Sequence, residues 1–539
     1  METVLQYIAL GVQSVFVGPE GALWFTPSLM VIAGVVIGIL VGATPGLSGP
    51  FALALATPLL ISAFGYGNEA LYPILGCLLG IMKGATVGGA VPAILFNTPG
   101  TPDAYLTTLD GHPMAMAGKG RKAIQTAHFA SVMGDNLSDL VLFIAAPGFA
   151  IAVERVLGLP EKSALIILSL CFMAAVVGNA PIKGLLGGLL GMLFSLVGST
   201  LSGAGPRMTL GVHELGGGIP LTSAILGVLV LSEVLVSIEA MRQDRRAQMV
   251  PEGPREMGPP LTWRERWRMI PGILQGGAIG TVIGALPGIG TTTAATLAYD
   301  VAKRRSRTPE AFGAGTPAGI VATESANSAV SGANLIPVMS LGIPGNFAAV
   351  FIILAVESVG DFTFGPAVFN FTPIRVVEGY GTILNESLVV AFGFFTMMMI
   401  ANVVNWTIGG GLMSLLSQLV RIPKDVMIPV ILVVALTAAY VQDGGYLGLF
   451  TALGFALVGY VLRRLEVSIL PFVIGFLLAP TLEGLLRGSY SASGADPYFL
   501  LRSPISIAML GLAVLLMVRM VRGARAASRA TSDIAAVDP

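Results

Sequence analysis

The stretch GVVIGILVGATPGLSGPFALALA, residues 34–56, determines how this chain folds. It begins and ends like an apolar membrane helix, with Gly34, Gly38 and Gly42 spaced so that they share one helix face. Between the apolar arms lies TPGLSG, which contains a Pro-Gly pair and two hydroxyl side chains. Because proline lacks the N–H that continues a helix, the stretch predicts two short helices joined at a break.

The same pattern recurs 242 residues later as GGAIGTVIGALPGIGTTTAATLA, residues 276–298. A second block, VPAILFNTPGT at 91–101, matches IPVMSLGIPGN at 336–346 with an offset of 245. Two blocks in the same order at nearly the same offset predict an internal two-fold repeat. The regularly spaced glycines also have an ordinary role, because small residues let membrane helices pack closely. That role explains the glycines but not the breaks.

The composition indicates a membrane protein. The chain has 539 residues, of which 54% are hydrophobic and 11% are charged, and its mean hydropathy is +0.82. Apolar stretches approaching the ~20 residues of a membrane helix recur from end to end. They are continuous, whereas the strands of a membrane barrel alternate. We therefore expect an all-α polytopic membrane protein with roughly ten to twelve transmembrane helices plus re-entrant helical hairpins.

Several function classes are not expected. The 30 basic and 30 acidic residues balance, so no nucleic-acid partner is indicated. No G-x-x-x-x-G-K-[ST] motif occurs, so transport driven by ATP on this chain is not expected. The two cysteines lie inside apolar segments and predict no disulfide. An intramembrane enzyme would need a convergent set of His, Asp or Ser, and the histidines are dispersed; we expect no enzyme and no cofactor.

Charges beside the two matching segments predict opposite orientations in the membrane. The linker 241–270 holds seven arginines and four acids, and KRRSR follows at 303–307, so hairpin 271–300 should open to the cytoplasm. Segment 27–64 has no Lys or Arg on either flank, and should open to the periplasm. Arms of about 15 residues span ~22 Å, less than the ~30 Å hydrocarbon core. The pattern predicts re-entrant hairpins in an inverted repeat, the architecture of many secondary transporters.

The predicted organisation has two halves joined by a basic linker. It comprises a first repeat at 1–240, with re-entrant hairpin 27–64 and broken segment 84–104; a cytoplasmic linker at 241–270; a second repeat at 271–521, with re-entrant hairpin 271–300 and broken segment 324–350; and a cytoplasmic tail at 522–539.

Five motifs carry a resemblance to a known family. They are GATPGLSGP (42–50), FNTPGTPDAYLTTLDGHPMA (96–115), RMTLGVHELGGGIP (207–220), GALPGIGTTTAA (284–295) and TESANSAVSGANLIPVMSLGIPGN (323–346). With these motifs the chain resembles, over nearly its whole length, the large membrane subunit of the bacterial tripartite tricarboxylate transporters, the TctA type. It departs from the usual Pro-Glu-Ser-Ala-Asn-Asn at Thr323 and Ser328 and carries Lys83 where a small or aromatic residue is usual.

The resemblance implies a secondary importer of organic carboxylates in the bacterial inner membrane. Its implied partners are a small membrane subunit (TctB type), a periplasmic solute-binding protein (TctC type), the carboxylate and the lipid bilayer. The implied energy source is a gradient of Na⁺ or H⁺. A stand-alone cation-coupled carrier that needs no binding protein is the alternative.

The breaks supply the candidate site residues. Backbone groups exposed at a mid-membrane break must be buried in protein or line a wet cavity, where inward helix N-termini favour an anion and carbonyls and hydroxyls suit Na⁺. The alternative role of such residues is a helix cap or turn. The substrate-binding candidates are Asn97, Thr98, Gly100, Thr101, Gly342, Gly345, Asn346 and Lys83. The cation-binding candidates are Thr44, Gly46, Ser48, Gly288, Thr291, Thr292, Thr293, Glu324, Ser325 and Asn327.

Two charged candidates have competing interpretations. Glu324, an acid inside a membrane segment, is a functional candidate by default, and could instead form a structural ion pair with Lys83. Lys83 could counter a substrate carboxylate, snorkel, or pair with Glu324. For Asp110, turn chemistry is preferred over binding. Arg207 in the loop 203–220 could dock a binding protein or belong to an ordinary surface loop.

Overall fold

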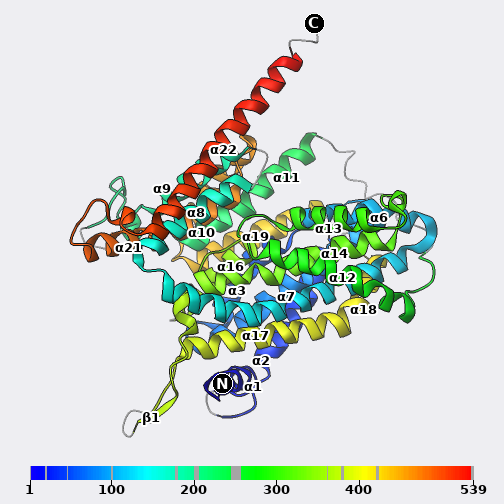
Figure 1. The fold of residues 1–539 in the computed structure, drawn as a ribbon, viewed down its shortest axis with the longest axis horizontal. Coiled ribbons are helices and arrows are strands. Elements are labelled where there is room, and N and C mark those ends of the chain that lie inside the picture. Colours follow the sequence, from blue (N-terminus) through cyan, green and yellow to red (C-terminus); the bar gives the residue numbers. More distant parts are fainter. Residues whose placement is uncertain are drawn as a thin grey trace. The chain divides into compact units, whose positions relative to one another are not determined.

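The fold consists almost entirely of helices, with very little strand (Figure 1). The structure, a computed structural model, describes residues 2–18, 21–44, 47–98, 101–176, 180–198, 205–243, 257–360, 362–377, 381–419 and 424–535. In that part of the chain the strands are β1 (Arg375–Val377) and β2 (Gly381–Ile383), which pair antiparallel. The prediction of an all-α polytopic membrane protein is confirmed.

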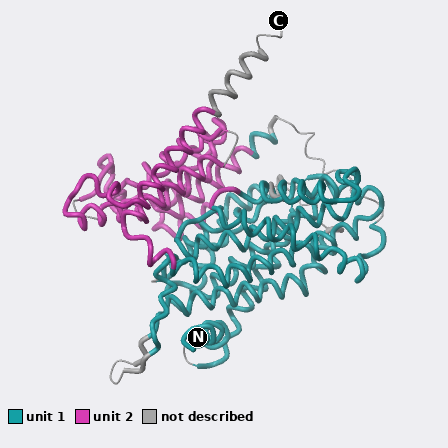
Figure 2. Tube along the Cα trace, in the orientation of Figure 1, with its two compact units in different colours: residues 1–151, 237–286, 290–434 teal, residues 152–236, 287–289, 435–539 magenta. Residues whose placement is uncertain are grey.

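The helices group into two compact units, coloured separately in Figure 2. The first unit takes residues 1–151, 237–286 and 290–434, and so draws on both predicted halves. Its helices are α1 (Glu2–Phe16), α2 (Thr26–Gly42), α3 (Gly49–Phe64), α4 (Asn68–Gly88), α5 (Ala90–Phe96), α6 (Thr108–Met114), α12 (Trp263–Gly284), α13 (Thr291–Arg305), α14 (Pro317–Ala333), α15 (Leu335–Leu341), α16 (Phe347–Val359), α17 (Glu386–Val404) and α18 (Gly410–Leu419).

The second unit takes residues 152–236, 287–289 and 435–539, again one long segment from each predicted half. Its helices are α8 (Leu159–Val176), α9 (Pro181–Ser195), α10 (Leu221–Ile225), α20 (Tyr446–Arg464), α21 (Ile469–Ala492) and α22 (Pro504–Ala535). Three helices contribute residues to both units: α7 (Gly120–Val156), α11 (Ser232–Gln243) and α19 (Lys424–Gln442). The cysteines Cys77 and Cys171 are buried and unpaired, as predicted.

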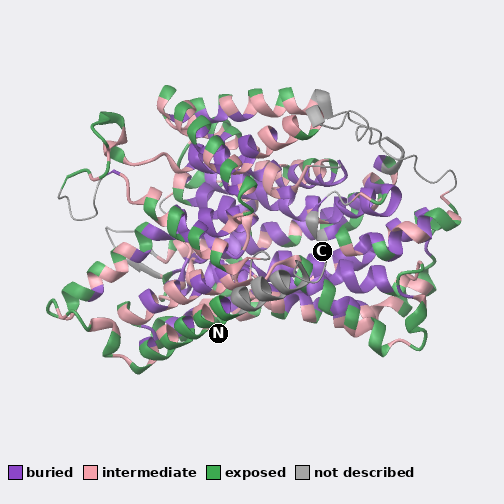
Figure 3. Cartoon of the chain, turned by 90° about the horizontal axis from the view of Figure 1, so that it is seen from above, coloured by how far each residue is buried: buried purple, intermediate pink, exposed green. Residues whose placement is uncertain are grey.

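Helix length separates full crossings from shorter segments. Among the described residues, 8 helical stretches are long and apolar enough to cross a membrane, and five apolar helices of 10–17 residues are shorter. The arms of the first predicted hairpin, α2 and α3, belong to the shorter class. In Figure 3, buried residues run along the helices and exposed residues gather at many of the loops. The stretch Asn68–Phe96, α4 and α5, is 94% buried in its most apolar window, which makes it a core element of the first unit.

One helix begins earlier than the sequence predicted. The linker was expected to extend to residue 270, but α12 starts at Trp263. The reason is a capping box: the Thr262 hydroxyl accepts from the Glu265 N–H, and the Glu265 carboxylate accepts from the Thr262 N–H. This reciprocal pair satisfies two N–H groups that a helix start leaves without partners.

The glycine rows of α2 and α12 pack against equivalent positions of α4 and α14. A Cβ on Gly38 would lie 2.5 Å from the carbonyl oxygen of Ile81, and one on Gly280 would lie 2.3 Å from that of Ala326. The two glycines are 242 residues apart and their contacts 245 apart, the offsets of the sequence repeat. The packing supports the predicted duplication.

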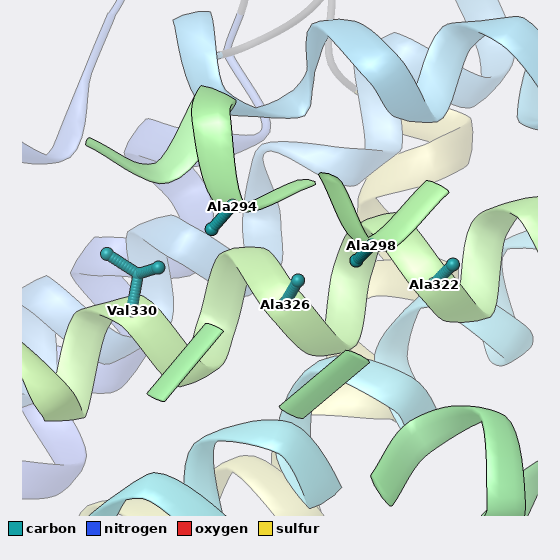
Figure 4. Packing of buried hydrophobic residues seen from close by; sticks show 5 residues of the cluster. All are labelled: Ala294, Ala298, Ala322, Ala326 and Val330. Atoms are coloured by element: carbon teal, nitrogen blue, oxygen red, sulfur yellow. The ribbon is translucent and has the colours of Figure 1, made fainter. Parts of the chain in front are cut away.

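Alanines continue this close packing between α13 and α14. Ala294 and Ala298 of α13 lie against Ala322, Ala326 and Val330 of α14, all of them buried (Figure 4). Side chains this small allow the helix backbones to approach closely. Close packing against α12 and α13 therefore positions the side chains of α14.

Candidate functional site

In each predicted half, a short buried helix is followed by a residue in the left-handed backbone conformation. This residue is Asn97 after α5, with φ 53°, and Gly342 after α15, with φ 71°. The next N–H groups, of Thr98 and Ile343, each donate to a proline carbonyl oxygen at 3.3 Å. These residue pairs are again 245 apart. The chain therefore breaks at the same register in both halves.

The break after α5 leaves hydroxyl groups without partners. The Oγ1 atoms of Thr98 and Thr101 are buried and have no hydrogen-bond partner within the part of the chain described. Thr101 is 6% exposed, and its Oγ1 lies 2.8 Å from where a Cβ of Gly89 would be. Leaving a buried hydroxyl unpaired costs about 1–3 kcal/mol, so such groups call for a ligand or water. Gly100 lies outside the described residues.

The break after α15 is capped from within. The Asn346 Oδ1 accepts from the N–H of Ala349 at 2.8 Å and thereby begins α16. Gly345 is buried beside it. The cap, one of the two interpretations of Asn346, is thus present, and the backbone of Gly345 remains a substrate-binding candidate.

The described residues on either side of the predicted tip between α2 and α3 show no cap from their side chains. The Thr44 hydroxyl donates to the carbonyl oxygen of Leu40 at 2.8 Å, the ordinary back-bond of a helix. Ser48 precedes α3 without a side-chain cap. Gly46 lies outside the described residues.

The equivalent tip in the second half begins α13. Gly288 has φ 84°, a conformation that glycine adopts without strain. Thr291, Thr292 and Thr293 form the first turn of α13, and Thr292 and Thr293 are exposed. These threonines stay candidates for the cation without a geometric feature that singles them out.

Helix α14 carries the buried acid. Glu324 is 0% exposed, and its carboxylate accepts from Thr107 Oγ1 at 2.5 Å and from Ser131 Oγ at 2.7 Å. The Ser325 hydroxyl instead bonds back to Val321 O at 2.7 Å. Asn327 is 1% exposed, and neither of its amide atoms has a hydrogen-bond partner among the residues that the structure describes. Glu324 and Asn327 therefore remain the stronger cation-binding candidates on this helix, and Ser325 is the weaker one.

Lys83 does not pair with Glu324, as one interpretation of the sequence allowed. Its Nζ lies 2.7 Å from Oδ2 of Asp135 and 2.6 Å from Oδ2 of Asp139, both on α7. The Asn402 Nδ2 of α17 donates to the same Asp139 Oδ2 at 2.6 Å. The lysine is fully buried, so it does not snorkel, and two carboxylates already surround its ammonium group. This arrangement argues against direct contact with a substrate carboxylate.

Asp110 has a structural role, although not the turn that was preferred. It lies on α6, where its Oδ1 accepts from the N–H groups of Gly313, Gly315 and Thr316 at 2.8–3.0 Å. Its Oδ2 accepts from the hydroxyl of Tyr299 at 2.9 Å. The carboxylate thereby holds the loop that leads into α14. Arg207, in the second unit, is likewise held, in an ion pair with Glu483.

The comparisons with known proteins identify a family for this chain. The model of the tripartite tricarboxylate transporter TctA family matches residues 29–474, most of the chain. The chain belongs to the TctA family. Two relatives of this TctA chain come from Agrobacterium vitis. An uncharacterized 52.8 kDa protein in the TAR-I ttuC′ 3′ region is 29% identical over 509 residues, covering 93% of this chain and 94% of the relative.

The second relative, an uncharacterized protein in the TAR-II ttuC′ 3′ region, is 29% identical over 233 residues, covering 43% of this chain and 90% of the relative. No solved structure matches this TctA chain. The family is one of transporters, and the apolar helices make the chain a multi-pass membrane protein.

Sequence reasoning missed the partners of the charged candidates in this TctA chain. Thr107 and Ser131 bind Glu324, and Asp135, Asp139 and Asn402 surround Lys83. A signal was available in DNLSD at 135–139, where two acids stand four residues apart and share a helix face beside an apolar run. Acids in membrane segments are functional candidates by default.

Proposed function

We propose that this TctA chain is the large transmembrane subunit of a three-component secondary transporter that imports organic carboxylates. A periplasmic solute-binding protein delivers the carboxylate, a small membrane subunit completes the complex in the bacterial inner membrane, and a cation gradient drives uptake. Membership of the tripartite tricarboxylate transporter family supports the transport role. The carboxylate class, the partners and the coupling go beyond that membership and form the proposal.

One observation supports the proposal most strongly: two buried helices break at equivalent positions, and hydroxyl groups at the first break have no partner among the described residues. These hydroxyls belong to Thr98 and Thr101. Asn334, whose Nδ2 likewise has no partner in the described part of the chain, stands between α14 and α15, before the second break. Hydroxyl and amide groups can donate to a carboxylate, and backbone N–H groups at a break add to them. We place the carboxylate at these breaks.

The buried acid of α14 supports the coupling. Glu324 lies inside the first unit with two hydroxyl donors, next to the amide of Asn327. Acids inside membrane segments mark ion pathways and proton relays by default. In this proposal Glu324 and Asn327 belong to the cation path.

Reconstitution into liposomes tests the function. The three proteins are combined, with the binding protein on the side equivalent to the periplasm, and uptake of radiolabelled tricarboxylate is followed under an inward Na⁺ or H⁺ gradient. We expect concentrative uptake that requires both the gradient and the binding protein. Concentrative uptake at full rate by the chain alone would favour the stand-alone carrier. No uptake of any carboxylate under either gradient would overturn the proposal.

A single variant tests the carboxylate position. Thr101→Val removes a hydroxyl that has no partner among the described residues, so we expect a raised KM for uptake and little change in thermal stability. Thr396→Val is the matched control, because the Thr396 hydroxyl only bonds back to Phe392 O within α17. Equal KM values in the two variants would place the carboxylate elsewhere.

A further inference from the structure

Three helices of the first unit converge on one buried cluster of charges. Lys83 comes from α4, Asp135 and Asp139 from α7, and Asn402 from α17. Lys83, Asp135, Asp139 and Asn402 are each 4% exposed or less. Ions this deeply buried need nearly complete compensation by charges and hydrogen bonds.

The charges of the cluster do not balance when both aspartates are ionised. One lysine carries one positive charge, and two ionised aspartates carry two negative charges, which leaves one negative charge in excess. A single monovalent cation would neutralise the cluster, whereas a divalent cation would leave it positive. The excess matters because the cost of an unpaired charge rises steeply away from water.

The hydrogen bonds of the cluster leave three of its acceptor oxygens without a donor among the described residues. Lys83 and Asn402 both donate to Oδ2 atoms, and among the described residues the Oδ1 atoms of Asp135 and Asp139 have no hydrogen-bond partner. The same holds for the Oδ1 of Asn402 in that part of the chain. Three buried acceptor oxygens therefore belong to one cluster, and oxygen is the ligand that hard cations prefer.

Helix α14 contributes an independent feature. The Asp139 Oδ1 lies 2.3 Å from where a Cβ of Gly332 would be, so it faces bare backbone of α14. Ser328 lies one helical turn before Gly332 and therefore on the same face. Ser328 is 1% exposed, and its buried hydroxyl has no hydrogen-bond partner in the described part of the chain. The register of α7 against α14 is consistent with this placement, because Gly134 of α7 contacts Ser325 of α14, one residue before Asp135 and three before Ser328.

We propose that Asp135, Asp139 and Asn402, with Ser328 opposite them, bind one monovalent cation of the size of Na⁺, and that this ion couples to transport. The coupling of the cation to transport rests on the proposed function, whereas the binding of the cation does not. The proposed site lies next to Glu324 along the contact between α7 and α14. Glu324 accepts a hydrogen bond from Ser131, which precedes Asp135 by one turn of α7. Lys83 holds the Oδ2 atoms in place while the cation contacts the Oδ1 side.

Two other occupants would behave differently. A proton on one aspartate would neutralise the cluster but supply one donor for three acceptors. A water molecule would supply two donors and leave the negative charge. Neither would make the stability of the protein depend on the identity of the alkali cation.

The test uses the purified full chain in detergent, without partner proteins or carboxylate. Its thermal unfolding midpoint is measured as NaCl replaces choline chloride at constant ionic strength. We expect a saturable rise with Na⁺. In Asp139→Asn, half-saturation should shift to at least a tenfold higher Na⁺ concentration. Asn402→Leu keeps the lysine and both aspartates and should shift it in the same direction, which covers a failure of Asp139→Asn to fold.

Asp443→Asn is the matched control, because Asp443 accepts from Ser223 in the second unit and should keep the wild-type response. A wild-type chain that responds equally to Na⁺ and choline would overturn the site. A Na⁺ response that both cluster variants retain would also overturn it. Neither result affects the reconstituted uptake experiment, so the cation site and the proposed function are tested independently. Na⁺ binding without Na⁺-dependent uptake would overturn the coupling of the cation to transport.

Discussion

The Nζ atom of Lys83 lies 2.6 Å from Oδ2 of Asp139, a residue 56 positions later in the chain. The pair joins α4 to α7 in the interior, and the same ammonium group contacts Asp135. Removing one partner of a buried ion pair leaves the other uncompensated. We therefore expect Lys83→Met to reduce the free energy of unfolding by about 3–5 kcal/mol.

The matched control is Lys162→Met, which removes an exposed ion pair with Glu154 and should cost at most about 1 kcal/mol. Denaturant unfolding of both variants, followed by circular dichroism, measures the difference. Equal stability of Lys83→Met and the wild type would show that the aspartates do not depend on the lysine.

The carboxylate of Asp110 anchors the loop before α14 through three N–H groups. Asp110→Ala leaves these groups without their acceptor, and we expect a loss of about 3 kcal/mol. Tyr299→Phe removes only the hydroxyl that donates to Asp110 and should cost about 1 kcal/mol. Thermal unfolding ranks the two. A Tyr299→Phe effect as large as that of Asp110→Ala would contradict the anchoring role.

The glycine contacts predict a matched pair of packing defects. A Cβ at Gly38 or Gly280 would meet a carbonyl oxygen at 2.5 Å or 2.3 Å. Each Gly→Ala change should cost about 1–3 kcal/mol by overpacking. Gly454→Ala in α20, where no atom lies near the new Cβ, should instead be neutral or stabilising by about 0.5–1 kcal/mol. Stable Gly38→Ala and Gly280→Ala variants would rule out the close helix contact.

Glu265 predicts a pH dependence at the start of α12. A hydrogen bond from the Lys122 ammonium, then those from Thr262, lower the pKa of Glu265 from 4.5 to about 2. A lowered pKa stabilises the fold above about pH 4.5, and this contribution fades as the pH falls toward 2. Glu265→Gln should therefore be less stable at pH 6 and closer to the wild type at pH 3. A constant difference between the two would contradict the linkage.

The sequence predicted the elements that depend on local chemistry. The predicted segment 27–64 agrees with the bounds of α2 and α3, and the predicted broken segments 84–104 and 324–350 contain the ends of α5 and α15. It could not predict which charges meet, because Lys83 finds its partners on α7 and α17. Glu324, which the sequence alone allowed as a partner of Lys83, instead accepts hydrogen bonds from the hydroxyl groups of Thr107 and Ser131. Such choices depend on helix register in three dimensions, which a single sequence does not contain.

The two hairpins carry the central claim, because an inverted repeat must open them to opposite sides of the membrane. The measurement replaces Cys77 and Cys171 by alanine and introduces Tyr66→Cys or Arg305→Cys, one beyond each hairpin. A membrane-impermeant maleimide is then applied to spheroplasts and to inside-out vesicles. We predict that position 66 reacts only from the periplasm and position 305 only from the cytoplasm. Reaction of both positions from the same side would contradict the inverted repeat and the transport site built on it.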